Sequence, residues 1–221
     1  AGSRFNGRSV LSRATSNRFM NENLLYYRGR IGRDHQFNGT AGAIFETSKV
    51  NQITAENQNY DVEVLGVYGL QNGTVPIIPT YNITKWSMAS FLARGEYSYK
   101  GRYLFTVTFR ADGSSRFSRT NKWGYFPSGA VAWRISDENF LRSSKTVSNL
   151  KLRATIGQSG NTAIPSYLTL STIGTYFSPM NGNTPNYGVV VERPENLSLK
   201  WETTFFFQAE DGIRYLTVTG V

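Results

Sequence analysis

The sequence has no cysteine, a single histidine and no long apolar run among its 221 residues. Without cysteine there is no disulfide scaffold, no thiolate zinc site and no cysteine nucleophile. With His35 as the only histidine, a multi-histidine metal site is excluded. The apolar stretches, such as residues 130–133, cover only a few positions, whereas a spanning helix needs about 20. The lack of long apolar runs therefore excludes a helical membrane protein.

Charge is unevenly spread along the chain. The formal net charge is +9, and the first 33 residues carry seven arginines against Glu22 alone. Such a segment is either a basic arm that binds nucleic acid or anionic lipid, or a solvated loop followed by a strand with arginines on one face. It has no heptads, helical period or zinc spacing, which favours the second interpretation and no nucleic-acid partner. Residue 1 is alanine and no apolar leader follows it, so we expect a mature protein or a fragment.

The dominant hydrophobic period is two. From Tyr103 to Arg110, one face carries Tyr, Phe, Val and Phe, and the other carries Leu, Thr, Thr and Arg. This alternation is typical of a strand with one apolar and one polar face. About seven such strands are expected, near residues 23–31, 36–50, 86–99, 103–110, 129–135, 150–156 and from 198 onward.

The expected connections alternate in length. Residues 32–35 and 100–102 form short turns, and 136–149 forms one or two helical turns that begin at Ser136. Three long connections are rich in Gly, Asn, Pro, Ser and Thr: residues 56–85, 112–124 and 158–197. Long loops at one end of the strands and tight turns at the other are typical of outer-membrane barrels, as are aromatics near the strand ends.

This pattern predicts an all-β fold, an antiparallel up-and-down transmembrane β-barrel segment of about seven strands that do not complete a barrel. A soluble β-sandwich alternates in the same way, so a carbohydrate-binding sandwich module remains the alternative. The exposure of Tyr103, Phe105, Val107 and Phe109 distinguishes the two, because a barrel turns this face to lipid and a sandwich buries it.

Several longer motifs give a more specific indication. In this order and spacing, they resemble the SusC/RagA family of TonB-linked outer-membrane proteins over residues 1–204. The strand–turn–strand of 86–110 and residues 21–25 resemble the same family. The four main motifs are RADGSSRF (110–117), WGYFPSGAVAWRI (123–135), NLKLRATIGQSGN (149–161) and NLSLKWETT (196–204).

The resemblance implies a function that the residues alone do not. Members are plugged barrels of about 22 strands in the outer membrane of Gram-negative bacteria, where they import oligosaccharides or peptides with energy from TonB. A SusD-like lipoprotein caps the mouth. Residues 1–204 would then belong to the barrel domain, with the plug and the TonB-contacting segment outside this sequence. No enzymatic activity and no cofactor are expected.

Candidate site residues follow from the predicted faces and loops. Charged residues on the polar face would line the lumen: Arg94, Glu96, Arg110, Arg134, Lys151 and Arg153. Tyrosines in the long loops would contact the solute or the lid: Tyr60, Tyr68, Tyr81, Tyr167, Tyr176 and Tyr187. His35 is expected to be a surface turn residue with no catalytic role.

The end of the chain departs from this pattern. Residues 205–215 read FFFQAEDGIRY, and three consecutive phenylalanines place rings on both faces of a strand. The stretch resembles translated sequencing-adapter read-through, so residues 205–221 are expected to be a non-native tail. The alternative is a genuine hairpin, since Asp211-Gly212 is a good turn.

Sequencing the source DNA across this frame tests the tail directly. We expect residues 205–221 to be replaced by a strand of alternating polar and apolar residues. Recovery of the same tail in independent long reads would contradict this prediction.

Overall fold

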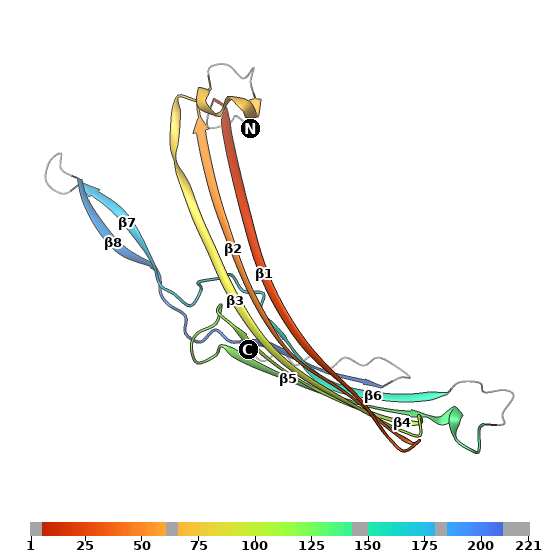
Figure 1. The fold of residues 1–221 in the computed structure, drawn as a ribbon. Helices are drawn as coiled ribbons and strands as arrows, with labels where there is room; N and C mark the ends of the chain where they lie inside the picture. Colours follow the sequence, from red (N-terminus) through yellow and green to blue (C-terminus); the bar gives the residue numbers. More distant parts are fainter. Residues whose placement is uncertain (1–5, 61–65, 143–149, 180–184, 210–221) are drawn as a thin grey trace. The chain divides into compact units, whose positions relative to one another are not determined.

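A computed structural model describes residues 6–60, 66–142, 150–179 and 185–209. Seven strands form one sheet in the order β1-β2-β3-β4-β5-β6-β9, and β7 and β8 pair as a separate hairpin (Figure 1). The strands are β1 (Arg8–Ile31), β2 (His35–Gln58), β3 (Val75–Tyr99), β4 (Tyr103–Ser114), β5 (Trp123–Arg134), β6 (Lys151–Asn161), β7 (Thr172–Pro179), β8 (Pro185–Arg193) and β9 (Glu202–Ala209). Two short 3₁₀ segments, η1 (Gly66–Asn72) and η2 (Ile135–Asp137), lie in connections.

The chain divides into two compact units. The first contains residues 1–19 and 47–86, and the second contains residues 20–46 and 87–221. The boundary between the units falls within β1, β2 and β3, which are the longest strands, with 24 or 25 residues each. The site described below lies in the second unit.

The alternation in β4 divides its side chains between the two faces as predicted. Tyr103, Phe105, Val107 and Phe109 are 37%, 45%, 65% and 46% exposed. The register continues this apolar face into the neighbouring strands, because Phe105 lies opposite Tyr97 of β3 and Val131 of β5. The exposed apolar face confirms the barrel expectation and argues against the sandwich, which would bury these side chains.

Tight turns join the first strands as the sequence predicts. Gly32 follows β1 with φ of +63°, and Lys100-Gly101 follows β3 with φ of +52° and +67°. Glycine adopts positive φ without the steric cost that a Cβ brings. These two turns therefore set neighbouring long strands antiparallel with little connecting chain.

Several strands begin or end beyond their expected limits, and β1 and β3 differ most. β1 starts at Arg8 rather than near residue 23, so most of the basic N-terminal segment is strand and not loop. β3 starts at Val75 rather than at 86, although it contains Pro76 and Pro79. The β3–β4 ladder ends at Met88, so these prolines have no β4 partner to lose. The β7–β8 hairpin was also missed within the long connection of 158–197.

The connection after β5 differs from the expected helical turns. Residues Ile135–Asp137 form a single 3₁₀ turn, and no side chain caps it. Ser136 lies inside the turn and therefore does not begin it. Residues 143–149 lie outside the described part of the chain.

A small apolar cluster lies in the second unit, at the strand ends that are joined by long connections. Phe117, Phe126 and Trp201 are buried, with ring centroids 5.1 Å apart for Phe117–Trp201 and 5.3 Å for Phe126–Trp201. The indole Nε1 of Trp201 donates a hydrogen bond to the Lys122 carbonyl oxygen at 3.0 Å. A Cβ at Gly124 would lie 2.6 Å from the Phe126 ring, so only glycine fits there without a shift.

The first residues of the suspected tail continue the sheet. β9 pairs with β6, and Phe205 and Phe207 share the exposed apolar face, while Phe206 lies opposite Gly157 on the polar face. Residues 210–221 lie outside the described part. The non-native origin of 205–221 therefore stays a prediction.

Replacing Trp201 with alanine should lower the free energy of unfolding by about 3 kcal/mol, because it removes a buried ring and leaves a cavity. Urea-induced unfolding followed by circular dichroism measures this change. Trp123→Ala is the control, since that ring is exposed and should contribute clearly less. Equal losses in the two variants would contradict the assignment of the cluster as a core.

Candidate functional site

The six charged residues that the sequence assigned to the polar face lie on one face of the sheet. Arg94 and Glu96 of β3 lie opposite Thr108 and Thr106 of β4. Arg110 lies opposite Leu92 in the same ladder.

Strands β5 and β6 supply the other three members. Arg134 lies opposite Lys151, and Arg153 lies opposite Ala132. Residues directly opposite in an antiparallel pair share a face, so all six lie opposite the exposed aromatic face.

Two of these arginines have close carboxylate partners on their own strands. The Nε and Nη2 atoms of Arg94 lie 2.9 Å and 2.5 Å from Oε1 of Glu96. Arg110 Nε lies 2.8 Å and 2.7 Å from the two oxygens of Asp112, which is buried. Partners two positions apart on a strand share a face, so these pairs neutralise charge locally.

The remaining three differ among themselves. Arg134 has a longer ion pair, 3.9 Å from Asp137 of η2. Lys151 and Arg153 are exposed, and within the described ranges neither side chain has a hydrogen bond or an ion pair.

A shallow depression of about 180 Å³ lies on this polar face. It is lined by Arg94 and Glu96 on β3 and by Lys151 and Arg153 on β6, with Thr106, Ala130 and Ala132 among the residues between them. The small side chains of Ala130 and Ala132 leave this space open, and charged side chains of β3 and β6 border it on both sides. The arrangement suits a polar solute or a charged segment of polypeptide.

The predicted loop tyrosines do not share one environment. Tyr60 is only 8% exposed, and its hydroxyl donates to the Leu70 carbonyl oxygen at 3.1 Å. Tyr68 of η1 is 86% exposed. Tyr81 lies in β3 and not in a loop, because that strand begins earlier than expected. Tyr167 is partly exposed in the connection before β7 and has φ of +69°.

The other two tyrosines lie in the hairpin strands. Tyr176 belongs to β7 and Tyr187 to β8, and their side chains lie outside the described part. Tyr60 therefore packs the connection that carries it, and Tyr68 presents an open ring.

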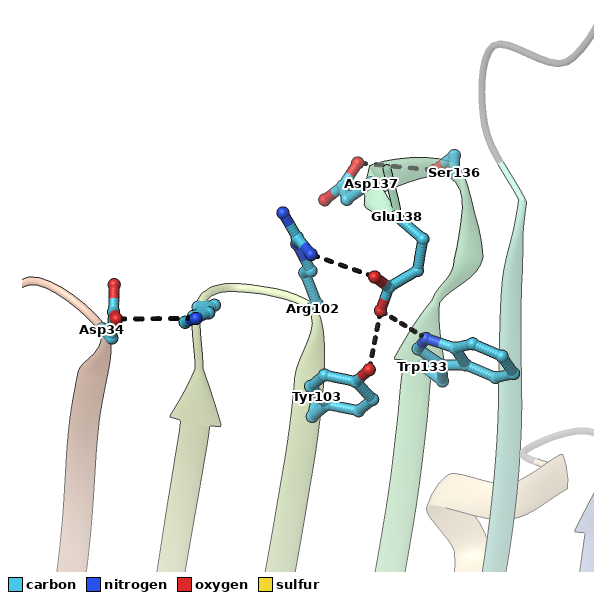
Figure 2. A network of polar contacts seen from close by, with 8 residues as sticks. Asp34, Arg102, Tyr103, Trp133, Ser136, Asp137 and Glu138 are labelled. Carbon is cyan, nitrogen blue, oxygen red and sulfur yellow. Dashed lines mark hydrogen bonds and ion pairs between the residues drawn. The ribbon is translucent and has the colours of Figure 1, made fainter. Parts of the chain in front are cut away.

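A polar network at the short-turn end was not found from the sequence. Figure 2 shows the Glu138 carboxylate held from three sides by Arg102, Tyr103 and Trp133. Arg102 Nη1 and the Tyr103 hydroxyl donate to it at 2.9 Å and 2.7 Å, and Trp133 Nε1 donates at 3.1 Å. Tyr103 and Trp133 lie opposite each other in the β4–β5 ladder, so the network fixes the chain after η2 to two strand ends.

The network changes the titration of Glu138. Hydrogen bonds from Tyr103 and Trp133, with the nearby charge of Arg102, hold the pKa of Glu138 below its ordinary value of 4.5, against the opposing effect of partial burial. In the sequence, Asp137 and Glu138 are only two adjacent acidic residues after a strand, and this pattern does not predict which groups they contact. The three partners of Glu138 come from two strand ends, residues 102–103 and residue 133, and spacing along the chain does not reveal that these ends meet.

His35 also differs from its expected role. It begins β2, its Nδ1 lies 2.8 Å from the Tyr97 hydroxyl, and its ring centroid lies 5.0 Å from that of Tyr99. The residue is therefore packed among aromatic side chains at the strand end and is not a free turn residue. No group of three potential metal-ligating side chains occurs within the described residues.

No family model matches the sequence. The chain is 38% identical over 189 residues to TonB-dependent receptor P26 of Formosa agariphila, covering 83% of this chain and 19% of that protein. It is 40% identical over 129 residues to TonB-dependent receptor SusC of Bacteroides thetaiotaomicron, covering 57% of this chain and 13% of that protein. The chain thus spans at most about a fifth of these relatives.

A solved structure of the RagAB peptide transporter has the same fold. It superposes with a TM-score of 0.75 at 22% identity, covering 90% of this chain and 22% of that one. Within the part of the chain that the structure describes, no helix is long and apolar enough to cross a membrane.

Glu138→Gln should weaken the network and speed amide hydrogen exchange in residues 135–142. Because folding lowers the pKa of Glu138, its ionised carboxylate stabilises this segment. The stabilisation is complete at pH values above the ordinary pKa of the group. That contribution is lost as the pH falls through the lowered value. After correction for the intrinsic exchange rate at each pH, the protection of residues 135–142 in the unchanged protein should therefore fall on acidification below pH 4.5, and the protection in the variant should not. Identical pH profiles for the two proteins would contradict a role for Glu138.

Proposed function

We propose, because the chain is a SusC/RagA-like segment of a TonB-dependent receptor, that it forms part of the barrel wall of a nutrient importer in the outer membrane of a Gram-negative bacterium. The observation that carries the proposal is the two-faced sheet. One face exposes aromatic and aliphatic side chains, and the other carries arginine, lysine and glutamate. A transmembrane barrel requires this division, with lipid outside and water within.

Strand length supports the same proposal. β4 and β5 each have 12 residues. At about 3.4 Å per residue and a tilt of about 40°, such strands rise about 31 Å, which matches the hydrocarbon core. Phe105 and Val131, at opposed positions in these strands, then contact lipid chains. Tyr103 and Trp133 lie near the turn end, where aromatic side chains prefer the interface.

The solute and partners extend the proposal beyond this segment. The RagAB peptide transporter supports import of peptides, and the family resemblance adds oligosaccharides as solutes and a SusD-like lipoprotein as partner. Energy would come from TonB through a region outside this chain. The charged polar face would line the lumen, and the exposed ring of Tyr68 would face solute or lid. The named relatives are receptors and transporters, which supports a role of this segment in transport and not in catalysis.

Single-cysteine labelling tests the wall assignment. These 221 residues contain no cysteine, and any cysteine elsewhere in the full-length receptor would first be replaced with serine. Spin labels at Val107→Cys and Thr108→Cys would be compared in the full-length receptor reconstituted in vesicles. Val107 lies on the apolar face and Thr108 on the polar face. The label at 107 should collide with oxygen dissolved in lipid, and the label at 108 with a water-soluble nickel chelate.

The same comparison at Phe105→Cys and Thr106→Cys serves as the replicate pair. Equal access to the nickel chelate at both members of each pair would contradict the proposed wall.

A further inference from the structure

Among the described residues, two of the six charged residues on the polar face have no oppositely charged partner, whereas the other four do. Lys151 and Arg153 are exposed on β6, and neither side chain has a hydrogen bond or an ion pair with a described residue. The arginines of β3 and β4 each have a carboxylate two positions away on their own strand. The positions of Lys151 and Arg153 lie about 7 Å apart along one face, because each residue advances about 3.3 Å.

The surroundings of this pair leave room for a ligand. Both residues line the depression of about 180 Å³, whose central positions include Ala130 and Ala132. Arg153 lies directly opposite Ala132, so no large side chain of β5 covers it on that side. Ser98 and Thr106 add hydroxyl groups to the lining. The depression thus combines two available cations on β6, neutral hydrogen-bonding groups and space, and the Glu96 carboxylate on its β3 side is paired with Arg94.

We propose that Lys151 and Arg153 form a carboxylate-binding site inside the barrel. The proposal rests on the proposed function, which places the polar face in the lumen. A guanidinium group presents parallel N–H donors that match the two oxygens of a carboxylate, and an ammonium group adds a point charge. The site would take a carboxylate from an acidic solute, or from a segment of the same polypeptide packed inside the barrel.

Succinate is a suitable probe, with uncharged succinamide as its control. Binding to the purified full-length receptor would be measured by calorimetry for the native protein and for Lys151→Gln/Arg153→Gln. If the site is open to solute, succinate binds, succinamide does not, and the double variant loses about tenfold or more in affinity. Lys151→Arg/Arg153→Lys keeps both charges and should retain binding.

Arg28→Gln/Arg30→Gln is the matched control. These two arginines have the same spacing on β1, and they alternate with Tyr27, which lines a groove on the apolar face together with Val107. They carry two charges on the polar side but do not line the depression. Their removal should leave succinate affinity unchanged. Equal loss in both double variants would overturn the site, since it would indicate only the general field of the lumen.

Thermal unfolding distinguishes the two sources of carboxylate. If a segment of the polypeptide occupies the site, succinate does not bind the native receptor, and Lys151→Gln/Arg153→Gln lowers Tm by several degrees while the control pair does not. Absence of both succinate binding and a Tm change would overturn the proposal. Spin-label accessibility of the Val107→Cys and Thr108→Cys variants, purified and reconstituted in the same way, shows separately whether the barrel wall itself has formed.

Discussion

Every backbone amide in a lipid-facing strand must find a partner on the neighbouring strand, because the hydrocarbon core offers none. This constraint produces the long ladders of β1 to β6 and β9, and it makes side-chain direction strictly alternate. Once the ladders form, residues opposite one another share an environment. Phe105, flanked by Tyr97 and Val131, therefore belongs to a continuous apolar surface, while Arg153 beside Ala132 belongs to a polar one.

The second unit is secured at its two ends by different chemistry. Near the long connections, Phe117, Phe126 and Trp201 form a small apolar cluster on which the loops pack. At the short-turn end, the carboxylate of Glu138 gathers three donors and holds the chain after η2 to the ends of β4 and β5. Between these ends, Arg94 and Arg110 have carboxylate partners on their own strands, whereas the side chains of Lys151 and Arg153 have none among the described residues.

Faces and turns could be predicted from the sequence because they depend on neighbours within a few residues. The alternation of apolar and polar residues predicted that Val107 lies on the apolar face, and Gly32 and Gly101 indicated the turns after β1 and β3. Strand limits depend on pairing instead, so the start of β3 at Val75, ahead of two prolines, could not be read from local composition. The six charged residues share one face of the sheet, as alternation predicts, and their place in the lumen stays a prediction. The Glu138 network was missed because its donors come from separate strand ends.

The central claim is that this sheet is one sector of a closed barrel wall. The most direct measurement is a cryo-electron microscopy map of the full-length protein in lipid nanodiscs. The account predicts that β1 and β9 each pair with a further strand on their outer sides, that Val107 contacts the lipid belt, and that Arg153 faces the enclosed interior. A map in which these strands leave the lipid belt and pack their apolar face against a second protein layer would contradict it.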